Sequence, residues 1–162
     1  MSFEKVKNYF ESIGLGDRVK KFENSSATVE MAAEAIGCEV EQIAKTLSFL
    51  VNDMPVLVVA AGNVRVDNRK FKAFFHQKPK MIPGELVREY TGHDSGGVCP
   101  FAVKSNVKIY LDISLKDNEI VYPGAGSGYS IVELSPGELE QYTSYEQWVD
   151  VCKLPAATSR NS

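Results

Sequence analysis

A β-hairpin near the middle of the chain is the pattern that best defines the fold class. Leu47, Phe49 and Val51 recur every second residue, the period that places side chains on one face of a strand. The turn sequence Asn52-Asp53-Met54-Pro55 leads from there into the uninterrupted apolar run Val56–Ala61. This run is far shorter than the ~20 residues that a membrane helix requires. The segment is therefore expected to form two paired strands of a sheet.

Helical periodicity and capping residues mark further elements on both sides of this hairpin. Apolar residues three and four apart predict a helix over 3–13, and Thr28 and Gly37 would cap a second helix at its two ends. We also expect a short helix near 39–44, helices over 67–75 and 83–90, a last helix from Ser135-Pro136, and strands over 107–111, 119–122 and 129–134.

The length and this order of elements indicate one α+β domain. A chain of 162 residues is long enough to bury roughly 70% of its unfolded surface in a single core. Short connections leave little room for repeated parallel crossovers, so a mixed curved β-sheet with flanking helices is expected in place of a doubly wound fold. We predict a single compact domain over residues 1–153 and a flexible C-terminal tail over 154–162.

Composition excludes several classes of protein. The net charge of −3 is incompatible with a strongly basic DNA-coating protein. The 3 cysteines lack a C-x-x-C pair and, with only 2 histidines, match no zinc spacing, so neither a metal nor a cofactor is predicted. The first ten residues lack the apolar core of a signal peptide. We therefore expect a cytoplasmic protein with no DNA or membrane partner.

Lys45 is the most informative single residue. The strand parity that directs Leu47, Phe49 and Val51 to the core directs Lys45 to the same side. One interpretation is a lysine at a helix C-terminus whose ammonium reaches water. The other is an ammonium that lines a cleft and holds a phosphate or carboxylate. The spacing alone leaves both open.

Two glycine-rich loops are the other candidate sites. In the first, residues 92–101, Gly96 and Gly97 would let backbone amides approach a ligand and form an oxyanion hole, with Pro100 stiffening the far side. The second, residues 122–128, has no phosphate-loop spacing. Each loop is equally compatible with an ordinary turn or hairpin connection.

The segment 65–88 carries most of the local positive charge. It holds seven basic residues against two acidic ones, although the chain as a whole is acidic. Such asymmetry suggests a face that contacts an RNA backbone, and a solvated helix surface explains it as well.

Taken together, these motifs resemble the YbaK/EbsC family, free-standing relatives of the editing domain inserted in bacterial prolyl-tRNA synthetase. The resemblance covers roughly residues 22–139. The motifs that carry it are Thr28 with Ala32-Ala33, Ile43-Ala44-Lys45-Thr46-Leu47, Gly92, Gly96-Gly97-Val98-x-Pro100-Phe101, Asp112-x-Ser114-Leu115 and Gly124-Ala125-Gly126 with Glu133-Leu134.

The resemblance implies a trans-editing hydrolase that removes a wrong small amino acid (Cys, Ala, Ser or Thr) from tRNA, with tRNA-Pro as the expected carrier. An aminoacyl ester is already activated, and each ~1.4 kcal/mol of lowered barrier gives a tenfold rate, so positioning supplies much of the catalysis. Water, a substrate 2′-hydroxyl or a substrate thiol would attack, and no protein base is assigned. The expected partners are the CCA end of mischarged tRNA and a synthetase such as prolyl-tRNA synthetase.

By the same resemblance, individual residues take roles in this site. Lys45 would bind the CCA end through phosphate, and the amides around Gly96 and Gly97 would receive the ester oxyanion. Pro100 would hold that loop in shape. The remaining residues implied in substrate binding are Thr46, Gly124 and Gly126 as walls of the amino-acid pocket, and Phe22 and Thr28 at its mouth.

The sequence leaves other functions open. A non-catalytic module that binds aminoacyl-adenosine or tRNA, with a regulatory role of the EbsC type, is the main alternative. A nonspecific RNA-binding protein would show steep salt dependence and no response to the attached amino acid. Some family members also carry serine where this chain has Gly124, which leaves the preferred amino acid undecided.

Overall fold

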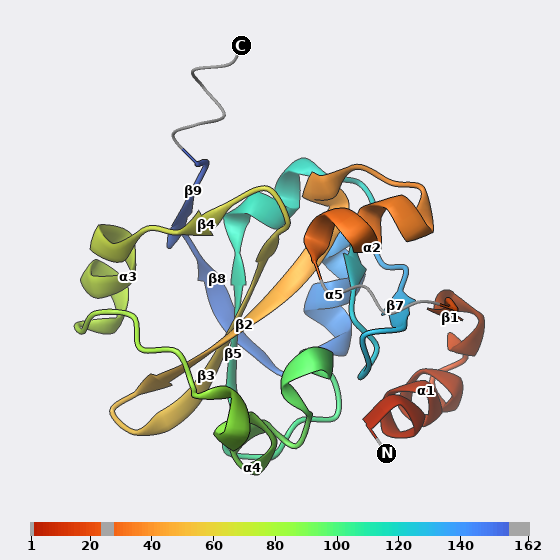
Figure 1. The fold of residues 1–162 in the computed structure, drawn as a ribbon, viewed down its shortest axis with the longest axis horizontal. Helices are drawn as coiled ribbons and strands as arrows, with labels where there is room; N and C mark the ends of the chain where they lie inside the picture. Colours follow the sequence, from red (N-terminus) through yellow and green to blue (C-terminus); the bar gives the residue numbers. More distant parts are fainter. Residues whose placement is uncertain (1, 24–27, 156–162) are drawn as a thin grey trace.

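A five-stranded sheet forms the centre of the computed structural model, which describes residues 2–23 and 28–155 (Figure 1). Its strand order is β6-β2-β3-β5-β8. The predicted hairpin is confirmed as β2 and β3, which pair antiparallel. The strands are β2 (Ile43–Val51), β3 (Met54–Ala61), β5 (Lys108–Asp112), β6 (Tyr122–Pro123) and β8 (Tyr145–Val149).

The other pairings in this sheet are parallel. β6 pairs parallel with β2, β5 with β3, and β8 with β5. The sheet is therefore mixed, as predicted, and the expectation that parallel crossovers would find little room is wrong. The connection from β3 to β5 is long, because residues 62–107 pass through β4, two α-helices and two 3-10 turns before the chain returns.

In the described part of the chain, five α-helices and two small ribbons surround the sheet. Figure 1 shows α3 on one side of the molecule, with α1, α2 and the β1–β7 ribbon on the other. The α-helices are α1 (Ser2–Ser12), α2 (Val29–Ile36), α3 (Asn68–Phe75), α4 (Val87–Thr91) and α5 (Pro136–Tyr142). The 3-10 turns are η1 (Gly16–Arg18), η2 (Val40–Gln42), η3 (Gly84–Leu86), η4 (Ser95–Gly97) and η5 (Ile113–Asp117), and the ribbons pair β1 (Val19–Lys21) with β7 (Ser130–Val132) and β4 (Arg65–Val66) with β9 (Cys152–Lys153).

The predicted caps of α2 are both present. Thr28 accepts a hydrogen bond from the Met31 amide at 3.1 Å, which satisfies one of the free donors of the first turn. Gly37 ends the helix in the left-handed conformation with φ 82°, where a side chain would be strained. Ser135 forms a reciprocal capping box with Glu138 at the start of α5. These local signals fix where the helices begin and end.

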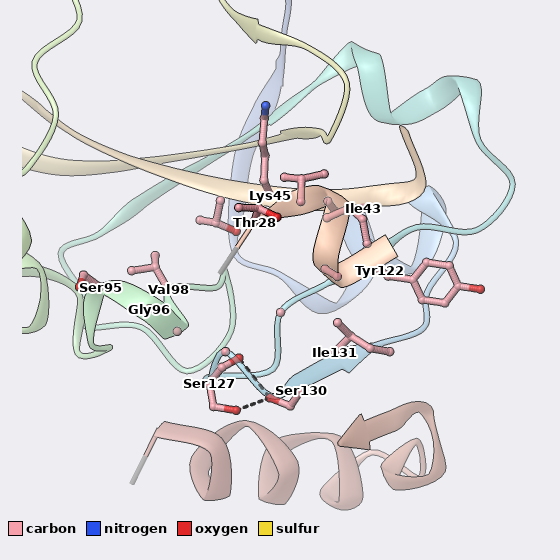
Figure 2. Close-up of a pocket in the computed structure, with 17 residues that line it drawn as sticks. Thr28, Ile43, Lys45, Ser95, Gly96, Val98, Tyr122, Ser127, Ser130 and Ile131 are labelled. Carbon is pink, nitrogen blue, oxygen red and sulfur yellow. Dashed lines mark hydrogen bonds between the residues drawn. The ribbon is translucent and has the colours of Figure 1, made fainter. Parts of the chain in front are cut away.

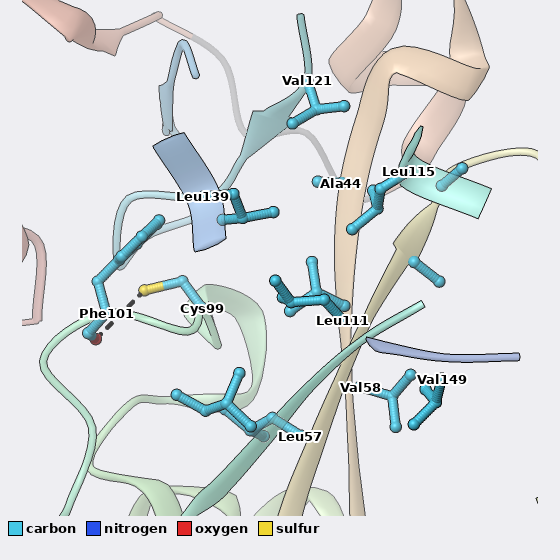
Figure 3. Packing of buried hydrophobic residues seen from close by; sticks show 14 of the residues in the cluster. Ala44, Leu57, Val58, Cys99, Phe101, Leu111, Leu115, Val121, Leu139 and Val149 are labelled. Carbon is cyan, nitrogen blue, oxygen red and sulfur yellow. Dashed lines mark hydrogen bonds between the residues drawn. The ribbon is translucent and has the colours of Figure 1, made fainter. Parts of the chain in front are cut away.

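The core lies on both faces of the central hairpin (Figure 3). Residues Val56–Ala61 of β3 are at most 3% exposed. The Phe49 and Phe71 rings pack in a tilted arrangement on the α3 side, with their centres 4.8 Å apart, whereas Leu57, Leu111 and Leu139 belong to the packing that Figure 3 shows around Cys99. Each fully buried large apolar side chain stabilises the fold by about 1.5–3 kcal/mol.

Some element boundaries differ from the sequence expectations. β2 begins at Ile43, so the segment 39–44 holds only the short η2 turn and not a longer helix. The strand expected over 119–122 is reduced to β6 at its far end. Of the predicted tail, Leu154 and Pro155 lie within the described residues and 156–162 lie outside them. None of the described helices is long and apolar enough to cross a membrane.

Candidate functional site

A cavity of about 490 Å³ opens between α2, the start of β2 and the two glycine-rich loops (Figure 2). We call it the main cavity. Its walls come from three segments that are distant in sequence, residues 28–46, 95–98 and 122–131. The lining residues are Thr28, Val29, Ala32, Ile43, Ala44, Lys45, Thr46, Ser95, Gly96, Gly97, Val98, Tyr122, Gly124, Ser127, Gly128, Ser130 and Ile131.

Six of the nine residues implied by the resemblance line this cavity. They are Thr28, Lys45, Thr46, Gly96, Gly97 and Gly124. Pro100 lies behind the loop, where it is buried. Phe22 and Gly126 line a neighbouring cavity that shares one wall with the main one. The structure thus brings most of the predicted residues together and separates two substrate-contacting candidates from them.

The Lys45 side chain extends away from the loop that carries Ser95 and Gly96 (Figure 2). Its ammonium donates to the carbonyl oxygens of Gly62 and Val64, just beyond the end of β3. Burial lowers the pKa of Lys45, and electrostatic interactions with Cys152 and Glu30 oppose that shift. Lys45 is therefore a half-buried cation in the cavity wall, and two backbone carbonyls already accept hydrogen bonds from its ammonium.

Asp112 and Cys152 form a buried polar pair at the ends of β5 and β9. The Asp112 carboxylate accepts hydrogen bonds from the amides of Ser114 at 3.0 Å and Val151 at 2.9 Å. Burial and the nearby Asp112 raise the pKa of the Cys152 thiol to about 12, and Lys45 acts in the opposite direction. The thiol stays protonated at neutral pH, so Cys152 offers no nucleophile.

Thr46 faces the opposite way from Lys45, because neighbouring strand residues alternate between faces. Its hydroxyl is buried and has no hydrogen-bond partner among the described residues. A buried polar group without a partner is costly, typically by about 1–3 kcal/mol. A hydroxyl of this kind in a cavity wall is a ready partner for a polar ligand atom.

Gly96 and Gly97 of the first loop have different environments. A side chain at Gly96 would meet no atom within 4 Å, so this residue borders open space. At Gly97 a Cβ would lie 2.5 Å from the Gly126 carbonyl oxygen, and its amide donates to the Asp94 carbonyl at 2.8 Å. The Gly97 amide is thus already hydrogen-bonded within the loop. The absence of a side chain at Gly97 allows the two glycine-rich loops to pack closely.

Within the first loop lies a buried pair, His93 and Cys99. In the sequence, His93 has no spaced serine or carboxylate partner for a triad, and Cys99 is interpreted as a packing residue. His93 Nε2 lies 2.7 Å from the Phe101 carbonyl oxygen and 3.6 Å from Cys99 Sγ. Burial lowers the pKa of His93 and raises the pKa of Cys99 to about 12. A fully buried, protonated thiol is not a nucleophile, which supports the packing interpretation.

Two lining residues, Ser130 and Ile131, were not anticipated from the sequence, whereas Tyr122 and Ser127 belong to the second glycine-rich loop. Ser127 and Ser130 place their hydroxyl oxygens 2.8 Å apart at the foot of the cavity (Figure 2). Tyr122 and Ile131 supply apolar wall on the same side. Ser127 lies in the second glycine-rich loop and Ser130 begins β7, and a pair of serines three residues apart is a weak signal without the fold. Within residues 2–23 and 28–155, no His, Cys, Asp and Glu side chains gather in a group fit to hold a metal ion.

Comparison with known proteins identifies the family. Residues 23–142 match the aminoacyl-tRNA editing domain. The chain therefore belongs to the aminoacyl-tRNA editing domain family, which confirms the resemblance found in the sequence.

Individual relatives cover the chain to different extents. It is 44% identical to the uncharacterized protein YwhH of Bacillus subtilis (strain 168) over 94% of this chain and 98% of that protein. It is 29% identical to EbsC of Enterococcus faecalis, named as a candidate Cys-tRNA(Pro)/Cys-tRNA(Cys) deacylase, over 72% of this chain and 73% of that one. Proline--tRNA ligase of Shouchella clausii matches at 31% identity over 78% of this chain and only 23% of the ligase.

Solved structures agree with this assignment. A crystal structure described as a candidate trans-editing enzyme for prolyl-tRNA synthetase has a TM-score of 0.84 and 29% identity, covering 94% of this chain and 97% of that one. The protein APE2540 has a TM-score of 0.81 at 30% identity, over 92% and 99% of the two chains. The mixed-sheet α+β fold is therefore that of a free-standing editing domain.

Proposed function

We propose that this protein is a trans-editing deacylase that hydrolyses the ester between a small amino acid and the terminal adenosine of tRNA, with tRNA-Pro as the carrier. The observation that carries the proposal is the main cavity, where Lys45, Thr46, Gly96 and Gly124 meet around a volume of about 490 Å³. This volume is typical of small-molecule sites. Membership of the editing-domain family and the names of the relatives supply the reaction class.

The geometry suggests how the site would act. Gly96 borders open space beside the cavity, so the backbone around it can approach the ester carbonyl and stabilise the oxyanion. Lys45 would reach a phosphate by turning its side chain away from the carbonyls of Gly62 and Val64. The ammonium would then exchange two neutral carbonyl acceptors for an anionic phosphate oxygen. A hydrogen bond between two charged groups is stronger than one to a neutral acceptor.

Attack on the ester needs a nucleophile, and the cavity has no protein group suited to that role among its described lining residues. The titratable side chains in the lining are Lys45 and Tyr122. Water, the 2′-hydroxyl of the terminal ribose or a thiol of the bound amino acid fills the role in this proposal. The protein contributes orientation and charge, which suffice for an activated ester.

A deacylation panel tests the proposal. The purified chain is mixed with tRNA-Pro charged with alanine, cysteine, serine or threonine, and release of the amino acid is followed over time. We expect release of at least one of them, and Lys45→Ala to lower kcat/KM by about tenfold or more, equivalent to ~1.4 kcal/mol. Lys108→Ala, at an exposed lysine on β5 outside the cavities described, is the matched control and should keep the parental rate.

Two outcomes would contradict the assignment. Absence of release from every charged tRNA would leave the non-catalytic binding module as the better description. Equal rates for Lys45→Ala and the parent would remove Lys45 from the site. Thermal melting of each variant separates loss of activity from loss of the fold.

A further inference from the structure

A second cavity of about 590 Å³ lies next to the main one. The two share Gly96, Gly97, Ser127 and Gly128, so these residues form a backbone ridge with one cavity on each side. The outer wall of the second cavity comes from the start of α1 and from residues 21–23, neither of which lines the main cavity. A ligand in the main cavity can therefore continue over the ridge into the second.

The ridge is held rigidly by close backbone packing. A Cβ at Gly126 would lie 2.7 Å from the Ser2 carbonyl carbon, so α1 rests directly on this loop. Gly97 packs on Gly126 from the other side, and the Phe22 amide donates to the Tyr129 carbonyl oxygen at 2.8 Å. The second cavity is thus built from ordered main chain and is not a gap between loose side chains.

Three aromatic rings line this cavity, from Phe3, Phe22 and Tyr129. Tyr129 is 47% exposed, so its ring is accessible to a ligand. The Lys21 ammonium lies 4.5 Å from the centre of the Phe3 ring, which adds a cation at the rim. Exposed rings beside a cation are the features with which proteins stack single-stranded bases.

The polar groups at the same cavity favour particular bases. Glu4, Glu23 and Asp94 line it, and a carboxylate accepts a hydrogen bond from the exocyclic amine of cytosine. Asp94 is largely exposed and its contact with Arg88 is long, at 3.7 Å, so it can accept a second donor. Uracil presents a carbonyl oxygen at the position of that amine and would face these carboxylates unfavourably.

We propose that the second cavity binds the penultimate nucleotide of the RNA 3′ end, and that it selects cytidine. The inference rests on the proposed function, in which the aminoacylated terminal adenosine occupies the main cavity. The 3′-terminal sequence CCA then places a cytosine one nucleotide behind the adenosine, on the far side of the ridge. The base stacks on Tyr129 and Phe22, and its amine donates to Asp94.

Binding of uncharged fragments tests this site independently of catalysis. The full chain is titrated with the dinucleotides CpA and UpA and with adenosine 5′-monophosphate, and dissociation constants are measured by NMR. We expect CpA to bind about fivefold or more tightly than UpA, the lower end of the discrimination given by one base-edge contact. Equal dissociation constants for CpA and UpA would overturn the proposal.

Protein variants locate the preference. Tyr129→Ala and Asp94→Asn should each reduce the ratio of UpA to CpA dissociation constants toward one. Tyr129→Phe keeps the aromatic ring and should retain the preference for CpA over UpA. This variant keeps the test valid if Tyr129→Ala folds poorly. Tyr145→Ala, at a tyrosine on β8 that lines neither cavity, is the matched control. A CpA preference that persists in both Tyr129→Ala and Asp94→Asn would place the base elsewhere.

Hydrolysis of the corresponding aminoacyl esters separates the two proposals. Preferential binding of CpA without any turnover would contradict the deacylase and support this site. Turnover of aminoacyl-CpA and aminoacyl-UpA with the same kcat/KM would contradict this site and leave the deacylase intact.

Discussion

Lys45 shows how far a single residue can be predicted from its place in a strand. Alternation along β2 correctly indicates a lysine on the same side as Phe49, and the structure finds it half-buried. The partners of its ammonium, the carbonyls of Gly62 and Val64, depend on how the chain leaves β3. No spacing within β2 contains that information, so the sequence left the direction of the amine open.

Gly124 is the residue at which the size of the cavity can be changed most directly. The nearest atom to a Cβ built there is the Val98 carbonyl oxygen, at 3.9 Å, so a side chain would project into free space without a clash. We expect Gly124→Val to lower kcat/KM for threonyl-tRNA more than for alanyl-tRNA, by about tenfold in the ratio, because a hydrophobic pocket discriminates by ~1–3 kcal/mol per methylene.

The measurement compares the two deacylation rates for the parent and for Gly124→Val. Gly84→Val serves as the control, since a Cβ at Gly84 also meets nothing within 4 Å and the residue lines none of the cavities described. An unchanged threonyl-to-alanyl ratio in Gly124→Val would show that the amino acid does not contact this wall.

Among the elements, those with their own local signals were predicted and those that depend on distant partners were not. The Thr28 and Ser135 caps lie within a few residues of the amides they satisfy, so α2 and α5 were found. β8, with the sequence Tyr-Glu-Gln-Trp-Val, has polar residues at its centre and exists because β5 offers a free edge. β8 forms through its pairing with β5, and the hydrophobic periodicity of the sequence gives no sign of that tertiary contact.

The contact between the two glycine-rich loops and α1 gives a prediction at the scale of elements. Gly126 has φ 93° and no room for a Cβ beside Ser2, so Gly126→Ala strains the backbone and separates the elements. We expect a loss of about 1–3 kcal/mol in the free energy of unfolding. Urea denaturation followed by circular dichroism measures it.

Gly96→Ala is the matched control, because the same added methyl group meets nothing within 4 Å. It should leave the free energy of unfolding within about 0.5 kcal/mol of the parent, as is usual for surface changes. If Gly126→Ala proved as stable as Gly96→Ala, the close packing of α1 on the ridge would not exist in solution.

The arrangement of the whole molecule decides where an RNA can lie. The main cavity joins residues 28–46, 95–98 and 122–131, and the parallel pairing of β2 with β6 brings the first and last of these segments together. The same topology divides the basic stretch 65–88. α3 lies on the opposite side of the molecule from α2 and the β1–β7 ribbon, whereas Arg88 belongs to α4 (Figure 1).

A third cavity, of about 520 Å³, adjoins the second cavity, and the two share the residue Ser2. Lys5, Arg88 and Lys104 line it beside two acidic residues. A tRNA whose 3′ end crosses the ridge would pass its backbone along this side. Phosphate contacts made by lysines contribute salt-dependent affinity.

Charge-reversal variants test whether the tRNA backbone lies along the third cavity or over α3. We expect Lys5→Glu/Lys104→Glu to lower kcat/KM for full-length charged tRNA by about tenfold or more at low salt, and to flatten its dependence on salt concentration. Arg69→Glu/Lys72→Glu changes as many exposed charges on α3 and is the matched control, with a smaller effect expected. The opposite order of effects would place the acceptor stem over α3, as the charge distribution of the sequence first suggested. Equal effects of both double variants would mean that net charge, and not a defined path, governs encounter with the tRNA.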